Sequence, residues 1–341
     1  MLIIRNVLFL FFVSFPAILF AQIGGQSVYP FLNLAISPRQ LALGGKNITI
    51  FDQDVNQGAI NPASINVEMD NQLAVNYTNL YGELNYGTAN YAYVWDRRTQ
   101  TIHAGIQYMS YGTFDGRDEL GNATGSFSAN EAALSVGYGY NIPFSDFYIG
   151  VNGKLITSQL ESYTSIGAAL DLGIIYKDDD NDIIYSLLVR NFGTQISTYA
   201  GLKERLPFEL LAGISQELQY VPLRWHITLE NLQQWDLSFS NPARAENTLD
   251  GGVKDEEVSF INNTMRHVVI GAELFPRKGF NIRLGYNFRR SQELSITDVR
   301  TFSGLSVGLG LKFGRFKFDY AYARFTAAAH VSMFGLTLNL E

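Results

Sequence analysis

The 341-residue chain contains no cysteine, which excludes structural disulfides, thiolate catalysis and a lipid-modified N-terminal cysteine. Charged residues are also scarce: they make up 17% of the chain, whereas hydrophobic residues make up 47%. This balance is too apolar for a disordered chain and poor in charge for a soluble protein. The net charge of −7 excludes a basic nucleic-acid-binding surface, so we expect no nucleic-acid partner.

Long apolar runs are missing as well, apart from one at the N-terminus. Arg5 is followed by the nearly unbroken apolar stretch Val7–Phe20 and by the small residue Ala21, a pattern typical of a cleaved signal peptide. An uncleaved membrane anchor is the alternative, but the stretch is shorter than the roughly 20 residues that a membrane-spanning helix needs. We therefore expect residues 1–21 to be removed and the mature chain to leave the cytoplasm.

Aromatic residues are plentiful, with 19 Tyr and 24 Phe, and many fall in segments that alternate between apolar and polar residues. In residues 279–289, Phe280 and Leu284 share one face, whereas Asn281 and Arg283 share the other. Such alternation is typical of β-strands with one apolar face. The pattern predicts about fourteen strands, at residues 71–80, 85–95, 100–111, 129–141, 146–158, 162–176, 183–192, 206–217, 223–231, 265–275, 279–289, 302–313, 315–325 and 330–340.

Strand length and link length both favour a membrane barrel over a soluble β-sandwich. Most segments span about nine to thirteen residues, as tilted transmembrane strands do and most globular strands do not. With the mature N-terminus in the periplasm, every long link falls on the outer side: 112–128, 193–205, 232–264 and 290–301. We therefore predict an all-β fold, a transmembrane antiparallel β-barrel in a Gram-negative outer membrane, in contact with its lipid and lipopolysaccharide.

The stretch before the first strand lacks this alternation. Ser37 and Pro38 suit the start of a helix and Gly44 its end, and the chain is then rich in Asn, Gln and Asp up to Ala63. A ring of about fourteen strands encloses a lumen too wide for side chains alone to fill. We therefore predict that residues 22–69 form a lumenal plug in a barrel made by residues 70–341, with plug residues Ser37, Arg39, Gly44, Gly45, Gln57, Asn61 and Pro62.

Successive side chains of a strand point to opposite faces, so the odd or even position of a residue (its parity) predicts its face. By this rule the following charged residues point into the lumen: Glu131, Lys154, Asp171, Arg190, Arg224, Glu230, Glu273 and Arg283. We interpret them as a polar network that bonds the plug, in preference to a catalytic or transport site. His103, His226 and His267 share this face, but none of these histidines has the sequence spacing of a metal site. Because no acid–base pair, catalytic triad, phosphate loop or metal cluster is recognisable, we expect no enzyme activity, no cofactor and no metal.

The longest predicted outer link, 232–264, carries Trp235, Leu237, Phe239 and Ile261 among Asn, Asp and Glu residues. Exposed apolar groups in a polar frame indicate a contact surface for a partner. A loop that packs on itself and caps the barrel is an equal alternative.

Several short motifs resemble one family of outer-membrane barrels. Ser37-Pro38-Arg39 with Gly44-Gly45, and Asn61-Pro62-Ala63 before the first strand, are similar to the N-terminal region of FadL-type barrels. Further similar motifs are Asn191-Phe192-Gly193, Leu206-Pro207, Tyr320-Ala321-Tyr322-Ala323 and His330-Val331-Ser332. Within this superfamily the mature chain looks most similar to the Bacteroidetes branch that contains PorV and PorQ, and to the PorQ family in length and pattern.

The resemblance implies a plugged barrel of about fourteen strands in the cell-surface attachment complex of the type IX secretion system. It also implies the partners: a PorZ-like surface protein, a PorU-like sortase and a PorV-like barrel. The chain would then anchor the surface protein and support the processing and attachment of secreted cargo. A FadL-like transporter of hydrophobic small molecules across the outer membrane is the alternative, and an open pore is a weaker one.

Overall fold

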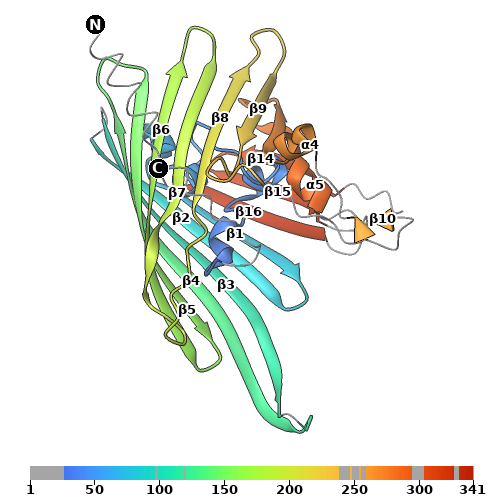
Figure 1. Cartoon of the computed structure of the whole chain (residues 1–341). Helices are drawn as coiled ribbons and strands as arrows, with labels where there is room; N and C mark the ends of the chain where they lie inside the picture. Colours follow the sequence, from blue (N-terminus) through green and yellow to red (C-terminus); the bar gives the residue numbers. More distant parts are fainter. Residues whose placement is uncertain are drawn as a thin grey trace, which may run out of the picture.

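The computed structural model describes residues 27–96, 99–118, 120–237, 246–247, 253–254, 259–293, 303–325 and 330–340. In this part of the chain, fourteen antiparallel strands form a closed ring in which the first strand pairs with the last (Figure 1). They are β1 (Gln72–Tyr81), β2 (Leu84–Asp96), β3 (Gln100–Arg117), β4 (Ala123–Asn141), β5 (Phe147–Leu160), β6 (Tyr163–Asp178), β7 (Ile183–Ser197), β8 (Glu209–Glu217), β9 (Leu223–Leu229), β12 (Val268–Leu274), β13 (Phe280–Asn287), β14 (Leu305–Phe313), β15 (Phe316–Arg324) and β16 (His330–Asn339). The predicted barrel and its strand number are confirmed; the predicted signal peptide lies outside the described residues.

The two faces of each strand show why this sequence forms a membrane barrel and not a soluble sandwich. On β1, Leu73, Val75 and Tyr77 are exposed on the outside, whereas Asn76 and Thr78 are buried on the inside. The apolar face therefore looks away from the protein, where only lipid can cover it, and the polar face lines the lumen. Because β1 pairs with β16, the ring is closed and lacks the two free outer edges that an open sheet would present to lipid.

The β3–β4 hairpin is longer than the sequence predicts, so the predicted link 112–128 is wrong over most of its length. Both strands continue far beyond the rest of the wall (lower part of Figure 1). Thr113 pairs with Ser128, and the rings of Phe114 and Phe127 stack with centroids 5.3 Å apart. Most side chains of this extension are exposed, so it needs no apolar face. Its sequence therefore lacks the alternation of apolar and polar residues on which the strand prediction depends.

Short helices replace parts of two other predicted outer links. Helix α4 (Phe260–Arg266) precedes β12, and helix α5 (Phe288–Glu293) follows β13 where the sequence predicts that the strand continues. A two-stranded sheet of β10 (Glu246–Asn247) and β11 (Val253–Lys254) lies between β9 and α4 in the chain. No helix in the described ranges is both long and apolar enough to cross a membrane.

Residues 27–69, here called the N-terminal segment, run through the ring from one end to the other. The segment contains η1 (Pro30–Asn33), α2 (Pro38–Ala42), α3 (Asn56–Ile60), η2 (Pro62–Ser64) and η3 (Val67–Met69). Ser27 bridges to Arg205, in the link after β7, whereas η3 leads into β1 at the opposite end. Taking the end with the shorter turns as periplasmic, Ser27 lies at the outer end, although we expected the chain to enter from the periplasm.

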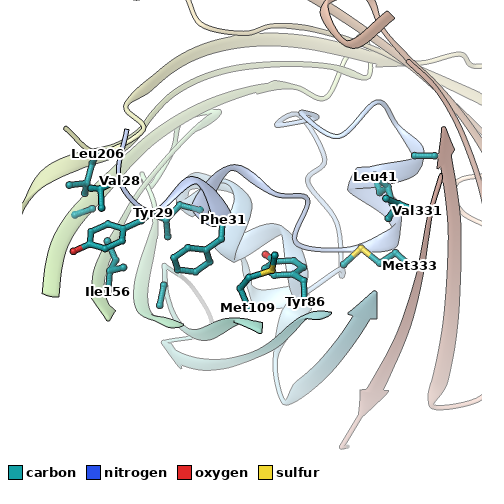
Figure 2. Packing of buried hydrophobic residues seen from close by; sticks show 14 of the residues in the cluster. Val28, Tyr29, Phe31, Leu41, Tyr86, Met109, Ile156, Leu206, Val331 and Met333 are labelled. Carbon is teal, nitrogen blue, oxygen red and sulfur yellow. The ribbon is translucent and has the colours of Figure 1, made fainter. Parts of the chain in front are cut away.

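Apolar side chains of the N-terminal segment pack against the inside of the wall (Figure 2). Val28 lies beside Leu206, and Phe31 lies near Tyr86 and Met109 from β2 and β3. On the other side of the ring, Leu41 of α2 packs with Val331 and Met333 of β16 in the same buried cluster. The segment therefore occupies the space that the strands enclose.

Candidate functional site

The start of α2 positions the most connected charge of the N-terminal segment. Ser37 is the N-cap, and its hydroxyl accepts a hydrogen bond from the backbone N–H of Gln40 at 3.3 Å. The Gln40 side chain in turn accepts from the N–H of Ile36 at 2.8 Å, one residue before the position that a capping box uses. Pro38 occupies the first helical position, and these caps hold the following Arg39 toward the wall.

Gly44 and Gly45 end α2 with positive φ angles of 92° and 87°. The Gly44 N–H donates to the Ser306 hydroxyl at 3.1 Å, and the backbone of residues 42–44 lies directly against Gly285 of the wall. A methyl group at Gly285 would overlap backbone atoms of Gly44 and Leu43. Glycine is required on both sides here because two main chains approach each other more closely than a side chain allows.

The second predicted turn of the N-terminal segment is fixed by Asn61. Its side-chain oxygen caps η2 through the N–H of Ala63 at 3.1 Å, and its amide donates to Ser186 of β7 at 2.8 Å and to the carbonyl oxygen of Ile48 at 3.0 Å. Pro62 begins η2 and packs against Gly150 of β5. Gln57 is buried and donates to Asp54, so its hydrogen bond stays within the segment.

A charge cluster joins the N-terminal segment to the wall near the periplasmic end; its members are Arg39, Asp52, Arg224, Glu273, Arg283 and Asp319. Arg39 faces Glu273 in a two-bonded arrangement, with Nε 2.9 Å from Oε1 and Nη2 2.8 Å from Oε2. The same guanidinium donates to Asp52 at 3.0 Å and 2.8 Å. Paired geometry of this kind makes a strong, directional contact.

The cluster extends from β12 to three further strands, β9, β13 and β15. Arg283 of β13 donates to Glu273 at 2.8 Å and to Asp319 of β15 at 2.5 Å. Arg224 of β9 lies 3.4 Å from Asp52 and 3.6 Å from Glu273. Burial by itself raises the pKa of Asp52, but the charge and hydrogen bonds of Arg39 outweigh it and hold the pKa below its ordinary value. The carboxylates of the cluster are therefore matched by cations.

Two further predicted lumen groups hold the outer half of the N-terminal segment. Arg190 of β7 donates to the carbonyl oxygen of Leu32 at 3.0 Å. Lys154 of β5 and Asp171 of β6 form a fully buried pair at 2.6 Å. Lys154 also donates to Asn191, whose side-chain amide donates to Asn33 at 3.1 Å.

The remaining predicted lumen residues do not bond the N-terminal segment. Glu131 accepts from the Tyr111 hydroxyl at 2.6 Å, and Glu230 accepts from the Asn287 amide at 3.2 Å. One partner that the prediction omits does so instead: Glu209 accepts from Lys46 at 2.5 Å. Asp319, which the prediction also omits, joins the charge cluster through Arg283 of the wall. Asp319 lies on the polar face of a predicted strand, so the same parity rule could have identified it.

The histidines stay apart in the structure. His226 contacts the Thr49 hydroxyl at 3.0 Å, whereas His103 packs against Gly58. Within the described residues, no group of three or more His, Asp or Glu side chains is arranged to hold a metal ion.

Trp235 and the first two residues of α4, Phe260 and Ile261, form an outer apolar patch; their exposed fractions are 53%, 71% and 74%. The Trp235 ring lies between Phe260 and His267, with centroids 5.3 Å and 5.4 Å away. The Asn263 amide donates to the Trp235 carbonyl oxygen at 2.7 Å. The patch is therefore exposed to solvent, while Asn263 and His267 fix the position of Trp235.

The base of the patch is polar and buried. His267 places Nδ1 2.8 Å from the Glu230 carbonyl oxygen and Nε2 3.0 Å from that of Trp235. Carbonyl oxygens only accept, so each of these contacts requires a donating ring nitrogen. Leu237, which the sequence predicts at a contact surface, is instead buried beside Asn263, and Phe239 lies outside the described residues.

Among solved structures, the crystal structure of a Pseudomonas aeruginosa FadL homologue is similar over 89% of this chain and 98% of that chain, with a TM-score of 0.50 and 10% sequence identity. CdiB from Acinetobacter baumannii matches 78% of this chain and 59% of its own, with a TM-score of 0.34 and 9% identity. CdiB from Escherichia coli matches 78% and 62%, with a TM-score of 0.35 and 8% identity. No protein-family model and no curated protein matches the chain. The first similarity shows an outer-membrane β-barrel with a FadL-like fold.

Proposed function

We propose that this outer-membrane barrel is a PorQ-like subunit of the type IX secretion attachment complex, which anchors a PorZ-like surface protein and works with a PorU-like sortase and a PorV-like barrel. The chain itself catalyses no reaction in this proposal. The observation that carries it is the outer apolar patch, which presents three large apolar side chains on a supported base. Rigid, exposed aromatic groups are the usual anchors of protein–protein interfaces.

The interior of the barrel supports an anchoring role. The N-terminal segment is bonded to the wall by the charge cluster at one end and by Arg190 at the other. Removing one partner from such a buried ion pair costs about 3–5 kcal/mol. A segment with several contacts of this kind acts as a fixed plug, and a subunit that holds a surface protein has no need for a gate.

A FadL-like transporter of hydrophobic small molecules is the second candidate, and one feature of β7 favours it. Asn191 has a φ of 55° and forms a bulge opposite Asp171. Arg190 pairs with Glu209 at the start of β8, and β7 continues beyond it to Ser197 without a β8 partner. A lateral passage for an apolar solute through the wall needs an interruption of this type.

Two variants test the anchoring proposal. Phe260→Asp with Ile261→Asp places charge on the outer apolar patch, and Leu120→Asp at the tip of the β3–β4 hairpin is a matched control because Leu120 is 87% exposed. Affinity capture from outer membranes, followed by mass spectrometry, should recover the three Por-type partners with wild type and with the control. The double variant should insert normally and lose the PorZ-like protein.

Capture of the PorZ-like protein at wild-type level by the double variant would contradict the patch as its anchor. Lipid-like density in the purified protein, together with uptake of a long-chain fatty acid in a transport-deficient host, would favour the transporter. Steady conductance of the wild type in planar bilayers would instead identify an open pore.

A further inference from the structure

A buried group of polar side chains lies at the bulge of β7, where Arg190 and Asn191 together oppose the single residue Asp171 of β6. Neighbouring residues of a regular strand point to opposite faces, but the bulge turns both Arg190 and Asn191 toward the N-terminal segment in the lumen. Lys154 of β5 reaches the same point from the other side of β6. The side chains of Lys154, Asp171 and Asn191, here called the bulge triad, are all buried.

The members of the bulge triad contact one another directly. Lys154 places Nζ 2.9 Å from Oδ1 of Asn191 and 2.6 Å from Oδ2 of Asp171. The other oxygen of Asp171 accepts from the backbone N–H of Asn191 at 2.8 Å, which fixes the carboxylate beside both partners.

The lysine nitrogen is also close to the amide carbon. A carbonyl bond of about 1.2 Å joins Cγ of Asn191 to Oδ1, so Nζ of Lys154 lies at most about 4.1 Å from Cγ. A movement of roughly 1 Å or less brings Nζ to the 3–3.5 Å from which a bond can form. Side-chain rotation alone supplies a movement of this size.

The bulge triad contains the groups that an acyl transfer needs. An amine that has given up a proton is a nucleophile, and the side-chain amide of Asn191 is an acyl group with nitrogen as its leaving group. Asp171 can take a proton from Lys154 and give one to the leaving nitrogen, first as general base and then as general acid. The buried guanidinium of Arg190, whose Nε has no acceptor among the described residues, supplies positive charge beside the amide.

We infer that Lys154 and Asn191 become joined by an isopeptide bond, an amide between two side chains, with Asp171 moving the protons. The bond from Nζ to Cγ forms and the bond from Cγ to Nδ2 breaks. One proton of the ammonium group goes to Nδ2, which leaves as ammonia, and one stays on Asp171 as a neutral carboxyl group. The step needs no oxidant or other reactant and replaces a buried ion pair by neutral groups, which are less costly to bury.

The ion pair of Lys154 and Asp171 is the state of the freshly folded barrel, before this reaction. An ammonium group cannot attack until it has lost a proton, so the bond forms after folding has brought the three strands together. The reaction occurs once within one molecule and turns over no substrate. Its product ties β5 to β7 across β6, at the level where β7 leaves its β8 partner, and is independent of the outer apolar patch.

The test follows the full-length folded barrel in detergent micelles, directly after purification and after prolonged incubation. Intact-mass spectrometry should show a loss of about 17 Da, the mass of ammonia, that increases with time. An N-terminal glutamine can also lose ammonia on cyclising, so the mass alone does not locate the change. Trypsin should therefore fail to cleave after Lys154 and should release a branched product that joins the peptides of Lys154 and Asn191.

Two variants and one internal control make the assignment specific. Lys154→Arg keeps the charge without the amine, and Asp171→Asn keeps the shape without the base, so neither should give the branched product. Lys46 is the internal control: it is paired with Glu209 at 2.5 Å, contacts no side-chain amide among the described residues, and should stay unmodified.

A folded wild-type barrel that yields no branched product after prolonged incubation would overturn the inference, whatever the variants do. A branched product that accumulates at the wild-type rate in Asp171→Asn would show that Asp171 does not move the protons. An equal loss of ammonia in Lys154→Arg would assign the loss to another residue and would also contradict the bond.

Discussion

Arg39 in the N-terminal segment and Glu273 on β12, which are 234 positions apart in the sequence, form a buried two-bonded ion pair. Arg283 shares the same carboxylate from the wall side. Glu273 is therefore the point at which the barrel wall and the N-terminal segment share one charge network.

Arg39→Met should destabilise the barrel by about 3 kcal/mol or more, because the fully buried Glu273 would lose one of its cations and the partly exposed Asp52 would lose its main one. The midpoint of denaturant unfolding, followed by the heat-modifiable mobility of the barrel on gels, measures the change. Lys177→Met is the control, since its partner Asp179 is 71% exposed, and it should cost at most about 1 kcal/mol. Equal losses in the two variants would show that the charge cluster does not hold the N-terminal segment.

Gly285→Ala should prevent the end of α2 from packing against β13. The added methyl group would overlap backbone atoms of Leu43 and Gly44, which cannot move away as a flexible side chain could. Overpacking of this kind costs about 1–3 kcal/mol. Gly153→Ala on β5 is matched in chemistry, but no atom lies within 4 Å of the added methyl group, so it should change stability by less than about 0.5 kcal/mol. Thermal unfolding of both variants compares them, and an unchanged Gly285 variant would contradict the close main-chain approach.

Acid should loosen the N-terminal segment only at low pH. The pKa of Asp52 in the folded protein is lowered, so its ion pair is complete above the ordinary carboxyl pKa of about 3.9 and is lost as pH falls through the lower folded value. Planar-bilayer conductance should therefore stay negligible from about pH 7 to pH 4 and rise below that. Asp52→Asn should conduct more at neutral pH and respond less to acid; a rise already near pH 6 would assign the response to another group.

Lys154→Met should destabilise the outer half of the barrel, because Asp171 would remain buried without its cation. The expected loss is about 3–5 kcal/mol. Adding Asp171→Leu should recover most of it, because an apolar pair needs no charge partner. Equilibrium unfolding of the single and double variants measures the coupling, and additive losses would show that the two side chains do not act as a pair.

The sequence predicts the ring because each strand has one lipid-facing apolar side, and a period of two is visible without any knowledge of partners. It fails on the β3–β4 extension, where both faces are exposed and nothing requires alternation. It also misses α4, because seven residues of mixed character carry too little helical periodicity to distinguish them from a loop.

Parity places charged residues in the lumen but cannot say which of them meet the N-terminal segment. Glu131 and Glu273 are equivalent in the sequence pattern, yet Glu131 bonds Tyr111 on the neighbouring strand and Glu273 bonds Arg39. The difference depends on the height of each residue in the wall and on the path of the segment. Both are properties of the assembled ring.

The path of the N-terminal segment also suggests an order of assembly. The segment runs from the outer end to the periplasmic end inside a ring that is closed by the pairing of β1 with β16. Two glycines of the wall lie directly against the segment: Gly285 at Gly44 and Gly150 at Pro62. A methyl group at either glycine would overlap the backbone of the segment. Because the segment fits so closely, we expect the strands to wrap around it before β1 pairs with β16, rather than the segment to thread a closed ring.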